Sequence, residues 1–180
     1  MIGRKGLAGT SIRAIAHEVG QTIGVVTHHF RDKSELLCAA LEACFQPWQN
    51  LVQSSRTIRD PMERLQWIMM ETLTDQGHVT PEMQLWLGML AQIDQDGDVA
   101  EAYRAQYAQT RQDMIALLSD CQSAGQISPD RNIEEEAEHL LALADGLMVS
   151  GTGDPRYYDV PRIKRIMARH ILAICASINH

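Results

Sequence analysis

Residues 10–37 decide the fold of this chain, and they read TSIRAIAHEVGQTIGVVTHHFRDKSELL. Thr10 or Ser11 caps a short helix, and Gly20 ends it in the left-handed conformation that glycine adopts at low cost. Thr22 caps a second short helix of about two turns. Apolar residues recur on one side of both helices, and short or polar residues lie on the other. The pattern indicates a helix-turn-helix, whose second helix can enter the major groove of DNA.

The rest of the chain also has the pattern of an all-α protein. Ala, Leu, Met, Gln and Glu dominate, and the alternation typical of β-strands is almost absent. Pro47 predicts a kink or break near residues 45–46. Further helices are expected over about residues 33–54, 61–77, 81–93, 99–124, 133–150 and 161–178. We therefore predict a helix-turn-helix DNA-binding domain over residues 1–45 and a larger helical effector-binding and dimerisation domain over residues 46–180.

Composition places the chain among ordinary globular proteins. It has 180 residues, of which 45% are apolar and 22% charged, and no run approaches the roughly 18 apolar residues that a membrane-spanning helix needs. The first residues lack the apolar core of a secretion signal, so we expect a cytoplasmic protein with no membrane partner. Cys38, Cys44, Cys121 and Cys175 are widely spaced, which indicates free thiols rather than a disulfide scaffold or a zinc ribbon.

Charge is distributed unevenly along the chain. Residues 1–36 carry five of the 16 Lys and Arg and three of the 23 Asp and Glu, a net charge of +2. The remaining residues carry a net charge of −9. Because His17, His28 and His29 also lie in the basic part, this asymmetry indicates an anionic partner for the N-terminus alone.

The helix-turn-helix stretch resembles the DNA-binding signature of the tetracycline-repressor (TetR) family. The shared features include Ile15-Ala16, Val19-Gly20, Gly24, an aromatic-rich tetrapeptide ending at Phe30, and Lys33. The resemblance implies a homodimeric transcriptional regulator, most often a repressor. Such a regulator binds a palindromic double-stranded DNA operator and responds to a small-molecule effector.

Two features depart from the family pattern. The tetrapeptide reads Thr27-His28-His29-Phe30 where tyrosines are common, and this variant resembles the branch related to the betaine-pathway repressor BetI. Family members also place a full helix ahead of Thr10. Residues 1–7 of this chain resemble only the tail of that helix. A truncated chain or a wrongly chosen start codon is therefore expected. The alternative function is a helical ligand-binding or dimerisation protein that no longer binds DNA because this helix is missing.

The resemblance also implies which residues contact DNA. Lys33 falls at a phosphate-contacting position at the start of a helix. Among the residues on the groove side, Gln21, Thr22 and His28 are those expected to recognise bases through hydrogen bonds. The full set carried over by position is Thr10, Ser11, Arg13, Gln21, Thr22, Ile23, Gly24, Val25, Thr27, His28, His29 and Lys33.

An effector would bind among the aromatic and methionine side chains of the larger half. The similarity to BetI implies a small cation held by aromatic faces, with an acid such as Glu71. The alternative is that these residues are ordinary core, as aromatic and methionine residues at helical spacing usually are. The candidate ligand-binding residues are Trp67, Met70, Glu71, Trp86, Met89, Tyr103, Tyr107, Met114 and Met148.

Two apolar stripes near the C-terminus predict a dimer interface of four helices about a two-fold axis. The alternative is that the stripes pack inside the chain. One stripe comprises Leu140, Leu143, Ala144 and Leu147. The other comprises Ile163, Ile166, Met167, Ile171 and Ile174.

Enzyme chemistry has little support in the sequence. No Gly-x-Ser-x-Gly motif is present, and Gly151-Thr152-Gly153 lacks the further glycines and the strand of a nucleotide-binding loop. Glu135 and His139 share a helix face, yet no third metal ligand is placed by the sequence. We interpret Glu134–Glu138 as the solvated first turn of a helix, whose acids favour the positive helix end. No enzyme activity, metal or cofactor is expected.

Overall fold

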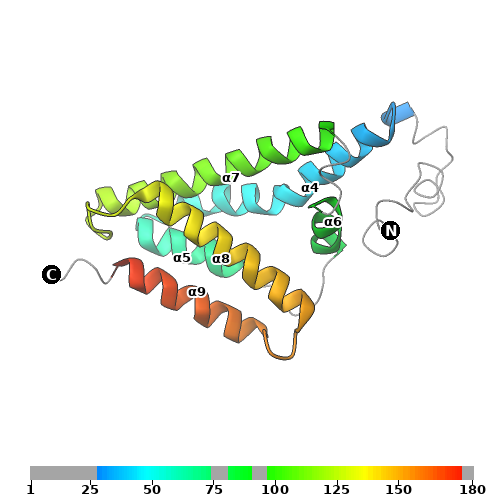
Figure 1. Cartoon of the computed structure of the whole chain (residues 1–180). Coiled ribbons are helices and arrows are strands. Elements are labelled where there is room, and N and C mark those ends of the chain that lie inside the picture. The colour runs from blue at the N-terminus through cyan, green and yellow to red at the C-terminus, as the bar shows by residue number, and fades with distance from the viewer. Residues whose placement is uncertain (1–27, 74–80, 91–96, 176–180) are drawn as a thin grey trace. The chain divides into compact units, whose positions relative to one another are not determined.

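The computed structural model describes residues 28–73, 81–90 and 97–175, which are mostly helical (Figure 1). The helices are α4 (Lys33–Ser54), α5 (Pro61–Thr72), α6 (Pro81–Leu90), α7 (Gly97–Ser123), α8 (Ile133–Gly153) and α9 (Val160–Cys175), with a short 3-10 helix, η1 (Ser55–Thr57), after α4. These ranges contain no strand, and the predicted all-α class is confirmed. None of their helices is both long and apolar enough to cross a membrane. The helices predicted within residues 10–29 lie outside the described residues, apart from His28 and His29, which are helical.

Two compact units make up the chain. The first comprises Met1–Gln46 and Thr80–Tyr107, and the second comprises Pro47–Val79 and Ala108–His180. Helices α4 and α7 therefore contribute residues to both units. The division after residue 45 into a DNA-binding and an effector-binding domain stays a prediction. The first unit also includes Thr80–Tyr107, which the predicted division placed in the larger domain.

A kink or a break is predicted near residues 45–46; helix α4 runs through Pro47 without interruption, so the break does not occur. Proline removes the amide hydrogen that the carbonyl of Ala43 would accept. Ala43 and Pro47 are both exposed, and water can bind this carbonyl in place of the backbone. The helix continues because the lost hydrogen bond lies on its solvent side.

Gly125 ends α7, as the sequence predicts. Its φ of +73° lies in the left-handed region that favours glycine. The N–H groups of Gly125 and Gln126 donate to the carbonyls of Gln122 and Cys121, each at 2.9 Å. These are the two hydrogen bonds of a Schellman motif, and they fix the last turn of α7.

Two other helix ends differ from the prediction. Helix α5 ends at Thr72 rather than near residue 77, and α8 continues through Gly153 rather than ending at Ser150. Gly151 lies inside α8 and is buried. Packing of this residue offsets the modest cost of glycine in a helix, about 0.5–1 kcal/mol relative to alanine.

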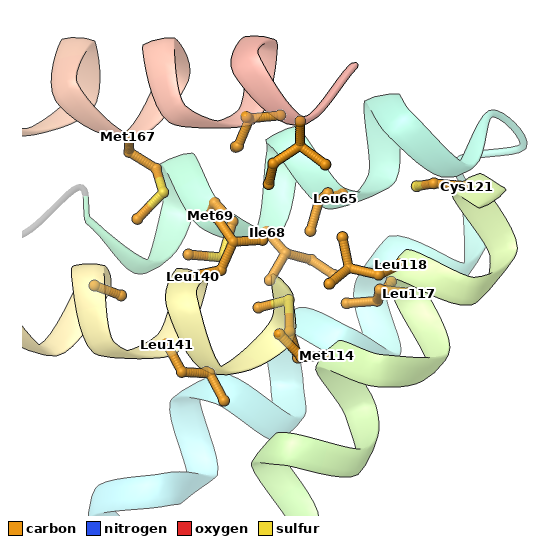
Figure 2. Close-up of a cluster of buried hydrophobic side chains, with 14 of the residues drawn as sticks. Leu65, Ile68, Met69, Met114, Leu117, Leu118, Cys121, Leu140, Leu141 and Met167 are labelled. Atoms are coloured by element: carbon orange, nitrogen blue, oxygen red, sulfur yellow. The ribbon is translucent and has the colours of Figure 1, made fainter. Parts of the chain in front are cut away.

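The core of the second unit lies between α5, α7, α8 and α9 (Figure 2). Complete burial of one leucine, isoleucine or methionine side chain contributes about 1.5–3 kcal/mol, so this cluster is a main source of stability. The residues labelled in Figure 2 include Leu65, Ile68 and Met69 of α5, Met114, Leu117 and Leu118 of α7, Leu140 and Leu141 of α8, and Met167 of α9.

The stripes predicted to form the dimer interface lie mostly in this core. Leu143 and Ile166 are partly buried against it. A side chain that its own chain already encloses has no surface left for a partner. The assignment is therefore corrected to core for seven side chains, each at most 5% exposed: Leu140, Ala144, Leu147, Ile163, Met167, Ile171 and Ile174.

Candidate effector and DNA-contact sites

Aromatic rings gather in the first unit. The rings of Tyr103 and Tyr107 stack with 5.6 Å between their centroids and 21° between their planes. Phe45 meets Tyr103 edge-on, with centroids 6.1 Å apart and planes at 64°. Trp86 and Met89 of α6 belong to the same hydrophobic cluster. We call these five residues the aromatic cluster; the faces of its rings can attract a cation through their quadrupoles.

Helical spacing brings the rings of the aromatic cluster together. Tyr103 and Tyr107 lie four residues apart on α7 and therefore share a face. On α4, Leu37, Leu41 and Phe45 recur every four residues and are buried. The two tyrosines and Trp86 are only partly buried, so the rings are anchored in an apolar cluster and still have surface for a ligand.

The residues predicted to bind an effector divide between the two units. One set belongs to the aromatic cluster: Trp86, Met89, Tyr103 and Tyr107. The other set belongs to the core of the second unit: Trp67, Met70, Met114 and Met148. Glu71 is exposed on α5. Sequence reasoning missed Phe45, because its place on the apolar stripe of α4 indicated core packing alone.

A polar contact between α4 and α7 was also missed. The indole Nε1 of Trp48 donates to Oδ2 of Asp113 at 3.1 Å. Gln109 Nε2 donates to the other carboxylate oxygen of Asp113 at 3.0 Å. Trp48 and Asp113 are 65 positions apart in sequence, so no local pattern signals the pair. The contact holds the C-terminal half of α4 against α7 within the second unit.

Lys33, one of the predicted DNA-contact residues, is the first residue of α4, and the residues around it form a hydrogen-bonded helix start. Oδ1 of Asp32 caps the helix by accepting the N–H of Glu35 at 2.9 Å. Oε2 of Glu35 accepts the backbone N–H of Arg31 at 2.6 Å and the Nε–H of Arg31 at 3.2 Å. These hydrogen bonds, the backbone one first, lower the pKa of Glu35 below its ordinary value. Lys33 opens α4, where backbone N–H groups and the helix dipole attract phosphate.

The structure describes three of the predicted DNA-binding residues. His28 and His29 are exposed, with their rings edge-to-face at 5.5 Å, and Lys33 is partly buried. Arg31 was not predicted, yet its side chain is 87% exposed beside them; its place in the basic N-terminal segment was the available signal. The other predicted residues lie outside the described part of the chain: Thr10, Ser11, Arg13, Gln21, Thr22, Ile23, Gly24, Val25 and Thr27.

The acidic start of α8 is not fully solvated, in contrast to the prediction. Glu136 is only 7% exposed, and its Oε1 accepts from Nη1 of Arg131 at 2.5 Å. His139 is an exposed neighbour, with Nδ1 3.8 Å from the second oxygen of Glu136. Within the described residues, no three His, Cys, Asp or Glu side chains are grouped to hold a metal ion. Glu136 is therefore an ion-paired residue that joins the start of α8 to the preceding loop.

Known proteins match the chain over nearly its whole length. Residues 1–40 match the model described as bacterial regulatory proteins, tetR family, and residues 61–176 match that of the C-terminal region of BetI-type transcriptional repressors. The HTH-type transcriptional regulator PksA of Bacillus subtilis is 29% identical over 179 residues, which cover 98% of this chain and 85% of that protein. The HTH-type transcriptional regulator BetI of Burkholderia ambifaria is 30% identical over 152 residues, which cover 83% of this chain and 75% of that protein.

Solved structures share the fold. A transcriptional regulator from Saccharomonospora viridis, crystallised in complex with choline, superposes with a TM-score of 0.78 at 24% identity. The superposition covers 95% of this chain and 89% of that one.

The matches settle the class of protein. The DNA-binding model covers the helix-turn-helix stretch, which weighs against a protein that no longer binds DNA. The matched models and relatives are transcriptional regulators rather than enzymes. Regulators of this family bind DNA and small-molecule effectors and act as dimers. By sequence along most of its length, and by its helical fold, the chain belongs to the TetR family of transcriptional regulators, with a C-terminal region of the BetI type.

Proposed function

We propose that this chain is a dimeric repressor that leaves its operator when a small organic cation binds the aromatic cluster. The observation that carries the proposal is the stacked pair of Tyr103 and Tyr107, with Phe45 edge-on to it. Aromatic faces of this kind bind quaternary ammonium groups by cation–π attraction. Choline, the ligand of the S. viridis regulator, belongs to this chemical class and is the first probe to use.

Helix α4 links the proposed effector site to the proposed DNA contact inside the first unit. Lys33 is the first residue of this helix, and Phe45 lies about 18 Å further along at a rise of 1.5 Å per residue. The helix is continuous between them. A displacement of Phe45 on ligand binding would therefore move the end of α4 that faces DNA. Effector binding shifts the population toward dimers whose recognition helices no longer fit successive major grooves.

For the dimer contact we propose the outer face of α8 and α9. The large apolar side chains exposed in the described residues are Val149 (45%), Tyr157 (53%) and Leu172 (59%), and they lie on α8, α9 and the loop between them. Gly146 is one turn from Val149, and within the described residues no atom outside its chain neighbours and its own helix backbone lies within 4 Å of the position that a Cβ would take there. Packing within the chain does not call for a glycine at this position, whereas close approach of a partner helix would.

Substitution of Lys33 by alanine tests the DNA contact. We expect weaker binding to every DNA sequence alike and a salt slope, log K against log[salt], that is reduced by about 0.9, because one phosphate contact is lost. The measurement is a fluorescence-anisotropy titration at several salt concentrations, with DNA from upstream of the gene. Arg56→Ala, at an exposed position on η1 in the second unit, is the matched loss of charge and should leave the slope unchanged. A Lys33→Ala effect confined to one base position would contradict the phosphate role.

Substitution of Tyr103 by leucine tests the effector site. The change keeps an apolar side chain but removes the aromatic faces, so choline affinity should fall by about 5- to 30-fold, the equivalent of 1–2 kcal/mol of cation–π attraction. Calorimetric titration with choline gives the affinity, and release of the operator gives the response. Trp67→Leu in the second unit is the matched control and should bind choline normally. A loss of affinity in Trp67→Leu but not in Tyr103→Leu would place the site in the second unit instead.

A further inference from the structure

The outer face of α8 changes from acidic to apolar along its length. Its exposed residues include Glu135, Glu138, Ala142, Gly146 and Val149. They recur at spacings of three and four, so they share one side of the helix. We call this row the α8 stripe. The acids stand at the start of α8 and the small and apolar residues follow them.

The outer face of α9 has a similar order with the opposite charge. Arg165, Arg169 and Leu172 are exposed at spacings of four and three, and we call this row the α9 stripe. Residues 156–169 hold five of the 16 Lys and Arg of the chain and a single acid, although the whole chain has a net charge of −7. The α9 stripe is therefore basic in its first part and apolar at its end.

The charges of both stripes are left without a partner by the chain itself. They are carried by Glu135, Glu138, Arg165 and Arg169, all exposed. Within the part of the chain that the structure describes, none of these four side chains takes part in an ion pair. By contrast, the neighbouring Glu136 is buried and ion-paired. The exposed charges are therefore available to a partner molecule.

Helices α8 and α9 run side by side in opposite directions (Figure 1). Residues 154–159 join the apolar end of α8 to the basic start of α9. At the other end, Nη2 of Arg131, just before α8, donates to the carbonyl of Ala173 on α9 at 3.3 Å. The acids of the α8 stripe and the arginines of the α9 stripe therefore lie at opposite ends of the helix pair.

A two-fold axis perpendicular to the helices brings these opposite charges together. It reverses the partner's helices, so that α8 of one chain runs parallel to α9 of the other. Glu138 and Gly146 are about 12 Å apart along α8, and Arg165 and Leu172 are about 10 Å apart along α9, at a rise of 1.5 Å per residue. Acid then faces arginine where Leu172 faces Gly146, which has no side chain. A parallel pair of chains would instead place acid against acid, which is unfavourable.

We propose that charge fixes the direction and the partner of the dimer: the acids of the α8 stripe pair with the arginines of the α9 stripe of a second copy. This inference rests on the dimer contact proposed above and adds the residues that select the partner. The pairing occurs twice, once on each side of the two-fold axis. Exposed ion pairs contribute little to stability singly, but opposite charges favour the matching partner because like charges repel. A second copy of this chain has the matching order of charges.

Charge reversal in the full chain, followed by analytical ultracentrifugation, tests the proposal. The acid variant carries Glu135→Lys and Glu138→Lys, and the arginine variant carries Arg165→Glu and Arg169→Glu. Each should raise the dissociation constant of the dimer by at least about tenfold, because like charges then meet on both sides of the axis. Added salt should weaken the original dimer and strengthen the dimers of both variants, since salt screens attraction and repulsion alike.

A swapped chain that carries all four substitutions tests the direction of pairing. Its net charge equals that of the original chain. It should dimerise with itself about as tightly as the original chain does, and this recovery also shows that the substitutions leave the fold intact. Native mass spectrometry of the swapped chain mixed with isotope-labelled original chain should show two homodimers and almost no mixed dimer.

Two acids on α5 provide the matched control for the acid variant. Glu63 and Glu71 are both exposed, and Glu63 lies in the first turn of its helix, as Glu135 does in α8. The double variant Glu63→Lys, Glu71→Lys makes the same change of charge away from the two stripes. Its dimer should dissociate at the same concentration as the original dimer.

Three results would overturn the proposal. The first is a dimer that neither charge reversal weakens although Val149→Arg dissociates it, in which case the dimer contact stands without the charge pairing. The second is a swapped chain that prefers the original chain to itself, as a parallel pair of chains requires. The third is an original chain that is monomeric at every concentration, which refutes the dimer contact itself.

Discussion

Replacement of Leu140 by alanine is expected to lower the free energy of unfolding by about 2–5 kcal/mol. Leu140 is completely buried in the core of the second unit, between α5, α7 and α9. The substitution removes three carbons from a position where the surrounding helices cannot fully collapse, so a cavity adds to the lost burial of apolar surface. Urea unfolding, followed by circular dichroism at one fixed protomer concentration, measures the change, because dimer formation makes stability depend on concentration.

Val149→Arg is the matched variant for Leu140→Ala on the same helix. Val149 is 45% exposed, so the fold of the chain should tolerate the change. A charge placed in the proposed dimer contact should shift the protein toward monomers in analytical ultracentrifugation. If Leu140→Ala dissociated the dimer without loss of stability, and Val149→Arg did not affect assembly, then the core and interface assignments would have to be exchanged.

Replacement of Arg131 by methionine should lower the free energy of unfolding by about 3 kcal/mol. Its Nη1 binds the buried Glu136 at 2.5 Å, and its Nη2 donates to the carbonyl of Ala173 on α9 at 3.3 Å. Methionine preserves the apolar stem but leaves the carboxylate buried without its charged partner, and such a loss costs about 3–5 kcal/mol. The Arg131 side chain is 33% exposed, so water enters and the lower figure applies. Chemical unfolding again gives the value.

A second ion pair provides the control for Arg131→Met. Arg64 and Asp120 are 2.7 Å apart, but Asp120 is 53% exposed, and exposed pairs contribute about 0–1 kcal/mol. Arg64→Met should therefore have a much smaller effect. The double variant Arg131→Met, Glu136→Leu should recover most of the loss, since it removes the unpaired charge along with its partner. If Arg131→Met and Arg64→Met lowered the free energy of unfolding by the same amount, burial of Glu136 would not determine the cost of losing its partner.

Local signals in the sequence predicted the helices well, because capping and helix termination depend on neighbouring residues. Gly125 ends α7 as predicted, and its Schellman hydrogen bonds span only a few positions. The all-α class follows from the same kind of signal. Pro47 is the exception. Whether Pro47 breaks the helix depends on whether the carbonyl of Ala43, which loses its hydrogen bond, faces solvent or protein. The local sequence does not indicate which.

The candidate sites were harder to predict because they depend on contacts between distant residues. An apolar stripe on α8 has the same spacing whether it packs against α9 or against a partner chain, so Leu140 and Leu147 were assigned to the interface. Glu136 sits in a run of acids that resembles a solvated turn, and only the fold shows its burial. Aromatic spacing on α7 indicated Tyr103 and Tyr107, but Phe45 joins them from a helix nearly sixty positions earlier in the chain.

The make-up of the first unit from two separate stretches of chain affects how the protein folds during synthesis. Leu37, Leu41 and Phe45 bury their side chains with Met89 and Val99, which are translated later. Chains generally begin to fold as synthesis proceeds from the N-terminus. On the ribosome, the early segment would therefore keep an uncovered apolar face until the residues up to Tyr107 have emerged. A fragment cut after residue 45 would expose the same face permanently, and chaperones would be expected to recognise it.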